Sequence, residues 1–264
     1  MAPGLIISLF VGAVVAGIVA ALLGIGGGVL LVPMMTLVFH VPLHNALGSS
    51  LVAAVAGSNA AALWPDKRRL MDIRLCWQLA MATTFGATLG AVVALASKPA
   101  IIEAVFALVL LYTAYRIARP PKTPAGELVE GKEGAPPGRL RRAALGLVAL
   151  FAGASSGLLG IGGGIIIVPA LNLILHKPFK VSTATSNLLI GLTALTGAFT
   201  YFWRGALLAV PTLPLAGGAF IGALLGSALD KRLSSQVLRW GMAALLLYSA
   251  IEMGSHLLVP YLAP

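Results

Sequence analysis

Two clusters of glycine residues carry the clearest chemistry in this sequence. The first is Gly24-Ile25-Gly26-Gly27-Gly28, followed by an apolar stretch and Pro33, and the second, Gly160–Gly164 followed by Pro169, copies it. Backbone N–H groups with no side chain in front of them, at the N-terminal end of a helix, can bind an anion. A nucleotide-binding P-loop would need a Lys-Ser/Thr pair, which is absent, and a dinucleotide fingerprint would need glycine at Val29. We therefore expect an anion site built from backbone amides, with close helix packing or a kink as the alternative.

Small polar side chains follow each cluster, within the next apolar stretch. Ser49 and Ser50 lie in the first copy, and Thr185, Ser186 and Asn187 lie at the matching place in the second. Polar side chains in such apolar surroundings face a cavity or another helix, and these groups could donate to an oxyanion. Hydrogen bonds between helices are the alternative role. We predict a binding site made of these residues: Gly24, Gly26, Gly27, Gly28, Ser49, Ser50, Gly160, Gly162, Gly163, Gly164, Thr185, Ser186 and Asn187.

The composition of the chain decides what surrounds these residues. Of 264 residues, 59% are hydrophobic and 10% are charged, against about 25% charged in an average soluble domain, and the mean hydropathy is +0.97. So few charged side chains cannot cover a globular domain of this size in water. The formal net charge of +10 lies in short loops rather than on a domain face, which argues against nucleic acid as a partner. The composition predicts an integral membrane protein and excludes a soluble enzyme.

Apolar stretches of about 20 residues predict membrane-spanning helices. The first and the fifth stretch are too long for one crossing and contain the glycine clusters, so we predict broken helices there. The expected fold is an all-α polytopic membrane protein with eight to ten membrane segments. The apolar stretches are 4–39, 44–64, 73–96, 100–118, 143–175, 181–203, 207–229 and 235–259.

The two halves of the chain repeat each other at an offset of 136 residues. LLGIGGGVLLVP at 22–33 returns as LLGIGGGIIIVP at 158–169, and Ser50 matches Ser186. Residues 119–142 between the halves are rich in proline, glycine and charge, which predicts a flexible cytoplasmic loop. We therefore divide the chain into a first transmembrane repeat, a loop and a second transmembrane repeat: 1–118, 119–142 and 143–264.

The positive charges predict how the repeats are oriented. If each glycine-broken stretch crosses the membrane twice, each half has five crossings and the second half is inverted. With residues 65–74 in the cytoplasm, this arrangement places 16 Lys and Arg residues inside and 2 outside, whereas single crossings give 12 and 6. Because cytoplasmic loops are enriched in Lys and Arg, we predict inverted repeats with both termini outside.

The sequence offers no pattern for catalysis or metal binding. The single cysteine and the four histidines lack the spacing of a metal site, and no Ser/His/Asp or paired-Asp set lies at membrane depth. We therefore expect no catalytic residue, no metal and no cofactor. Glu103 and Glu252 are the acidic residues within the apolar stretches, and we expect them at the membrane interface, with proton coupling as the alternative.

The duplicated motif resembles that of a known family. The pattern GIGGG-xxxx-P at Gly24–Pro33 and Gly160–Pro169, with polar crossings at Ala46–Ser50 and Ser182–Ser186, is similar to that of the TauE/SafE family of sulfite and organosulfonate permeases. The resemblance implies transport of a small sulfur-containing anion across the bacterial cytoplasmic membrane, often outward. In the second copy Asn187 replaces Leu51, so the two half-sites differ chemically.

These features together predict a membrane permease. We expect the two halves to alternate access about facing glycine turns, with Pro33 and Pro169 as hinges. Its partners would be a small sulfur anion and the lipid bilayer, with a homo-oligomer as a further option. Two alternatives stay open: an anion channel lined by the same dipoles, and a non-transporting membrane assembly protein whose broken helices only pack.

Overall fold

The computed structural model of the chain describes residues 3–24, 26–118, 139–175, 177–229, 243–244 and 246–253. These residues form helices joined by turns, with no strand among them, as the sequence predicts for an all-α protein. A further helical stretch covers residues 246–253. In chain order the elements are α1 (Pro3–Leu23), α2 (Gly28–Pro33), the π-helix η1 (Met34–Val38), α3 (Leu43–Leu63), α4 (Pro65–Leu70), α5 (Ile73–Ala96), α6 (Pro99–Ala118), α7 (Arg139–Leu159), α8 (Gly164–Leu175), α9 (Phe179–Trp203) and α10 (Ala209–Leu229).

Within the described part of the chain, seven helices have the length of a membrane crossing. α1, α3, α5, α6, α7, α9 and α10 have 20 to 25 residues, or about 30 to 38 Å at 1.5 Å per residue. Large apolar side chains such as Trp77, Met81 and Phe85 are exposed along α5, as expected where lipid replaces water. Four helical stretches are both long and apolar enough to cross a membrane: Gly4–Leu22, Leu43–Leu63, Ile73–Ala96 and Ala209–Leu229.

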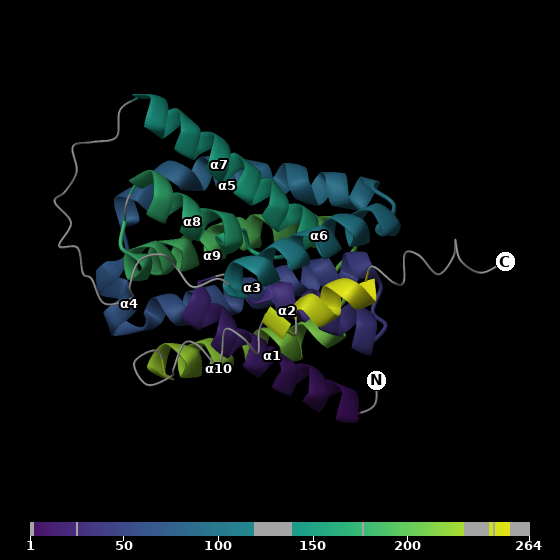
Figure 1. Ribbon diagram of the computed structural model, residues 1–264. Helices are drawn as coiled ribbons and strands as arrows, with labels where there is room; N and C mark the ends of the chain where they lie inside the picture. The colour runs from purple at the N-terminus through teal and green to yellow at the C-terminus, as the bar shows by residue number, and fades with distance from the viewer. Residues whose placement is uncertain are drawn as a thin grey trace.

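The long helices interleave the two halves of the chain. They pack in the order α1, α10, α3, α9, α5, α7, and Figure 1 shows α1 and α10 along one side, α5 and α7 along the other, and α3 and α9 between them. α5 of the first half therefore packs on α7 of the second, and α10 of the second half packs on α1 of the first. The offset of 136 residues relates α1 to α7, α3 to α9 and α5 to α10. If each helix is exchanged for its counterpart, the packing order is reversed, so the two halves pack in equivalent ways.

Glycines bring the interleaved helices into backbone contact. Gly90 of α5 lies against the carbonyl oxygen of Ala154 on α7, and Gly226 of α10 lies against the carbonyl oxygen of Ile18 on α1. A methyl group added to Gly226 would lie 2.5 Å from that oxygen. These two contacts are themselves related by the 136-residue offset, and close approach of this kind is typical of helix pairs packed through small residues.

Three segments differ in detail from the sequence prediction. The apolar stretch after the first glycine cluster is a short α-helix that continues as a π-helix, and Pro33, which has no N–H to donate, stands at the junction. The short helix α4 occupies the connection that was expected to be a loop. α7 begins at Arg139, so the last four residues of the predicted loop 119–142 are helical, while residues 119–138 lie outside the described residues.

Candidate anion site

Both glycine clusters break the helices that contain them, as predicted. Between α1 and α2, Gly24 and Gly26 have φ angles of 65° and 84°. Between α7 and α8, three glycines lie in the same left-handed region: Gly160 at 69°, Gly162 at 89° and Gly163 at 77°. A residue with a side chain is strained in this region, which is the physical reason for glycine at these positions.

The two glycine turns lie directly against each other. A methyl group added to Gly26 would lie 2.5 Å from the carbonyl oxygen of Ile161 and 3.6 Å from Cα of Gly162. A methyl group added to Gly28 would meet the carbonyl oxygen of Gly160. The turns therefore meet backbone to backbone, which is the facing arrangement expected from the duplicated clusters.

Two serines cross-link the glycine turns. Ser50, on the helix that follows the first turn, bonds to the second turn, and Ser186, on the helix that follows the second turn, bonds to the first. Ser50 Oγ donates to the carbonyl oxygens of Gly160, at 3.0 Å, and of Leu47, at 2.8 Å. Ser186 Oγ donates to the carbonyl oxygen of Gly24 at 3.4 Å, which is the equivalent contact at the 136-residue offset. Because both buried hydroxyl protons are used within the protein, these two serines offer only lone pairs to a ligand in this conformation.

The next pair of predicted polar residues also has protein partners. Ser49 Oγ lies 2.8 Å from Thr212 Oγ1, which joins α3 to the first turn of α10. Thr185 Oγ1 accepts a hydrogen bond from the backbone N–H of Asp72 at 3.0 Å, which joins α9 to the residue that precedes α5. Ser49 and Thr185 are related by the 136-residue offset, as are α10 and α5, so the two contacts occupy equivalent places.

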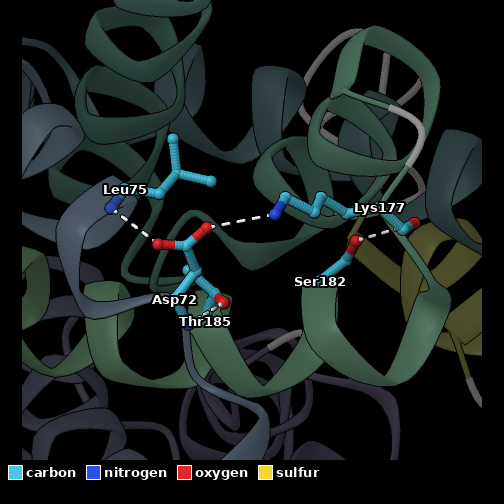
Figure 2. Close-up of polar contacts among 5 residues, drawn as sticks. All are labelled: Asp72, Leu75, Lys177, Ser182 and Thr185. Carbon is cyan, nitrogen blue, oxygen red and sulfur yellow. Dashed lines mark hydrogen bonds and ion pairs between the residues drawn. The ribbon is translucent and has the colours of Figure 1, made fainter. Parts of the chain in front are cut away.

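Asp72 lies at the centre of a polar cluster that joins the two halves of the chain, shown in Figure 2. Its Oδ1 accepts from the backbone N–H of Leu75 at 3.0 Å, which caps the N-terminus of α5. Its Oδ2 lies 3.3 Å from Nζ of Lys177, whose carbonyl oxygen accepts from Ser182 Oγ at 3.4 Å. The Asp72 and Lys177 side chains are 28% and 40% exposed, so this ion pair adds little stability, about 0–1 kcal/mol.

Asn187 differs from the other polar residues of the predicted site. Its side chain is 3% exposed, and among the described residues its Nδ2 has no hydrogen-bond partner. It lines a small cavity beside the first glycine cluster, together with Gly26, Gly27 and Ser58. An unpaired amide in a protein interior is unfavourable by about 1–3 kcal/mol, so this group has an unused donor to offer a ligand.

The two predicted hinge residues lie inside helices. Pro33 is the last residue of α2, directly before the π-helix, and Pro169 lies within α8. Each removes one backbone hydrogen bond from its helix, which lowers the resistance to bending there. Their role as hinges stays a prediction.

Three polar partners of the site were not identified from the sequence. Asp72 had an available signal, because an aspartate directly before an apolar helical stretch is a favoured N-cap. No sequence signal indicated Lys177 or Thr212, because each contacts a partner that lies more than one hundred residues away in the chain. Across the described ranges no group of three or more His, Cys, Asp or Glu residues could hold a metal ion.

Comparison with known proteins assigns the chain to a family. The family described as "Sulfite exporter TauE/SafE" matches residues 9–253. The chain belongs to the TauE/SafE family. Its match covers both glycine clusters and all the long helices except the first six residues of α1, so the family resemblance seen in the motifs is confirmed for nearly the whole chain.

Curated relatives of this TauE/SafE protein are named as transporters. "Probable membrane transporter protein YunE" of Bacillus subtilis (strain 168) is 27% identical over 240 residues, which cover 85% of this chain and 88% of the relative. A "Probable membrane transporter protein" of Xylella fastidiosa (strain 9a5c) is 27% identical over 226 residues, covering 83% and 82%. No solved structure matches the chain. The family and these relatives identify the chain as a multi-pass membrane transporter.

Proposed function

We propose that this protein carries small sulfur-containing oxyanions, sulfite or short organosulfonates, across the bacterial cytoplasmic membrane by alternating access. The observation that carries the proposal is the contact between the two glycine turns, at the point where the two halves of the chain meet. A serine from the helix after the first turn bonds to the second turn, and a serine from the helix after the second turn bonds to the first. Broken helices that meet in this way are typical of the substrate site of secondary transporters. The family description supports a sulfur oxyanion as the substrate.

The orientation that we propose follows from the Asp72–Lys177 contact. If each glycine-broken stretch crossed the membrane once, the segments 65–74 and 177–180 would lie on opposite faces. The distance of 3.3 Å between the two side chains instead supports one common face, as inverted repeats require. The positive charge of both segments then favours the cytoplasm for this face and the outside for both termini.

The interleaved helices change which parts would move. The sequence suggests that residues 1–118 and 143–264 move as separate bodies. Because α5 and α10 each pack on the other half, we propose instead that α1, α3 and α10 move as one body and α5, α7 and α9 as the other. The serine-bonded glycine turns lie between these two bodies, so they would carry the motion.

Two polar contacts would then hold the helices of each body together, at opposite faces of the transporter. On the cytoplasmic side Asp72 binds Thr185 and Lys177, and on the outer side Ser49 binds Thr212. Each contact joins helices of the same body, so both contacts would stay intact while the two bodies move. An anion channel needs an open path through the centre, and the backbone contact between the turns argues for a carrier rather than a channel.

Counterflow in proteoliposomes tests the proposal. Vesicles with purified protein are loaded with unlabelled sulfite or methanesulfonate, and uptake of the same labelled anion is measured over a range of concentrations. A carrier gives saturable uptake that is accelerated by substrate on the far side, whereas a channel gives uptake without this acceleration. Empty vesicles are the control, and no flux with any sulfur oxyanion, from protein that is folded, would contradict the proposed function.

A further inference from the structure

A cavity lies beside the first glycine cluster, between α1, α3, α9 and α10. Its volume is about 10 Å³, roughly the space that one water molecule needs. Apart from Ser58 and Asn187 the described residues that line it are glycines and alanines, including Ala20, Ala53 and Ala219. Because these residues are small, a modest separation of the helices would enlarge the cavity without displacing a large side chain.

Asn187 is the polar residue of this lining whose donor is unpaired. Its Nδ2 is buried and lacks a partner among the described residues, whereas Ser58 Oγ already donates to the carbonyl oxygen of Val55 at 3.2 Å. Buried donors without a partner are rare in folded proteins and call for an explanation by a ligand or a bound water. Asn187 therefore brings one unpaired amide donor to the residues that line the cavity.

The equivalent place in the other half is filled by a side chain. Leu51 is the counterpart of Asn187 at the 136-residue offset, and it has no polar group. Its Cδ1 lies 3.0 Å from the position of a methyl group added to Gly197, and Gly197 is the counterpart of the cavity residue Ala61. Leu51 and Gly197 thus pack against each other at the place where Asn187 and Ala61 line a cavity. The site that includes Asn187 therefore has no equivalent at Leu51.

The lining also limits the charge of the occupant. None of the described residues around the cavity is charged, so an anion would be opposed only by dipoles. Transfer from water becomes much less favourable as the charge increases, which disfavours doubly charged ions such as sulfate. The alanine methyl groups suit a small apolar substituent on the ligand.

We propose, resting on the transport function above, that Asn187 and this cavity form a one-sided binding site for a singly charged oxyanion with a small apolar group. The amide of Asn187 donates to an oxygen of the anion, and the alanines surround its apolar part. Methanesulfonate is the probe with these properties, and sulfate is the matched probe with a second charge and no methyl group.

Substitutions at Asn187 test the site by binding and by transport. Stabilisation of the purified protein by methanesulfonate against thermal unfolding measures binding, and counterflow measures KM. We expect Asn187→Ala to raise KM by about tenfold or more, the loss expected for a hydrogen bond to a charged group, with little change in maximal rate. Asn187→Leu, which introduces the residue of the other half, should abolish both binding and flux.

A matched control removes a different unpaired polar atom. Ser227 Oγ is buried without a partner among the described residues and does not line the cavity, so Ser227→Ala should leave KM and binding unchanged. Unchanged KM and binding in Asn187→Ala would overturn the inference and leave the cavity as the place of a water molecule. Equal binding of sulfate and methanesulfonate would overturn the charge selectivity.

The two proposals fail in different ways. Methanesulfonate binding that is lost in Asn187→Ala supports the site even if the wild-type protein shows no flux, and that result would contradict only the transport function. Flux of sulfite or methanesulfonate that is insensitive to Asn187→Ala and Asn187→Leu supports the transport function and overturns the site. The absence of both binding and flux overturns both.

Discussion

Replacing Gly26 by alanine tests whether the contact between the glycine turns holds the fold together. Its φ angle of 84° is unfavourable for a residue with a side chain by about 1–2 kcal/mol. The added methyl group would lie 2.5 Å from the carbonyl oxygen of Ile161, where ordinary contact begins near 3.4 Å, so the turns have to separate. Overpacking of this kind costs about 1–3 kcal/mol. We therefore expect Gly26→Ala to destabilise the protein by about 2–5 kcal/mol.

Two further glycines give matched comparisons. A methyl group on Gly162, the counterpart of Gly26, would lie 2.9 Å from Cγ2 of Ile190, a side chain that can rotate away. Gly162→Ala should therefore lose less stability than Gly26→Ala, although its φ of 89° is equally strained. Gly146 on α7 has open space at its Cβ position, so Gly146→Ala should be neutral or stabilise by about 0.5–1 kcal/mol.

The assay uses the single cysteine of the chain. Cys76 is a buried free thiol, so a dye that fluoresces on reaction with thiols reports unfolding of the detergent-solubilised protein. Because unfolding of a membrane protein is often irreversible, the order of the midpoints at one heating rate is compared rather than their absolute values. The reasoning is refuted if Gly26→Ala unfolds together with Gly146→Ala, or if Gly162→Ala is the least stable of the three.

Three more predictions follow from polar contacts. Tyr201 Oη donates to the carbonyl oxygen of Gly157 at 3.0 Å in a fully buried place, so Tyr201→Phe should lower stability by about 1–3 kcal/mol in the thiol-dye assay. A double-mutant cycle of Asp72→Ala and Lys177→Ala should give a coupling below about 1 kcal/mol, since the pair is partly exposed. In a Cys76→Ala background, Lys177→Cys should react with impermeant reagents only from the cytoplasm, and labelling from outside would contradict the proposed orientation.

Properties that depend on local sequence could be predicted from the sequence alone. Mean hydropathy and the length of the apolar stretches indicate a membrane protein, because the cost of burying charge in lipid acts on each segment by itself. The breaks at Gly24–Gly28 and Gly160–Gly164 were predictable because four glycines in five residues permit left-handed backbone angles that other residues avoid. The family followed from the same motifs.

Only the tertiary structure decided which groups meet. The sequence suggested two adjacent repeats, and the structure interleaves them, because α5 and α10 find their closest glycine contacts on the opposite half. The sequence predicted five polar side chains as ligands of an anion, yet four of them form hydrogen bonds with protein atoms that lie 110 to 163 residues away in the chain. Asn187 alone among those five has a buried polar atom with no hydrogen-bond partner among the described residues. Such pairings depend on distances between helices far apart in the chain, and no local pattern of residue types specifies those distances.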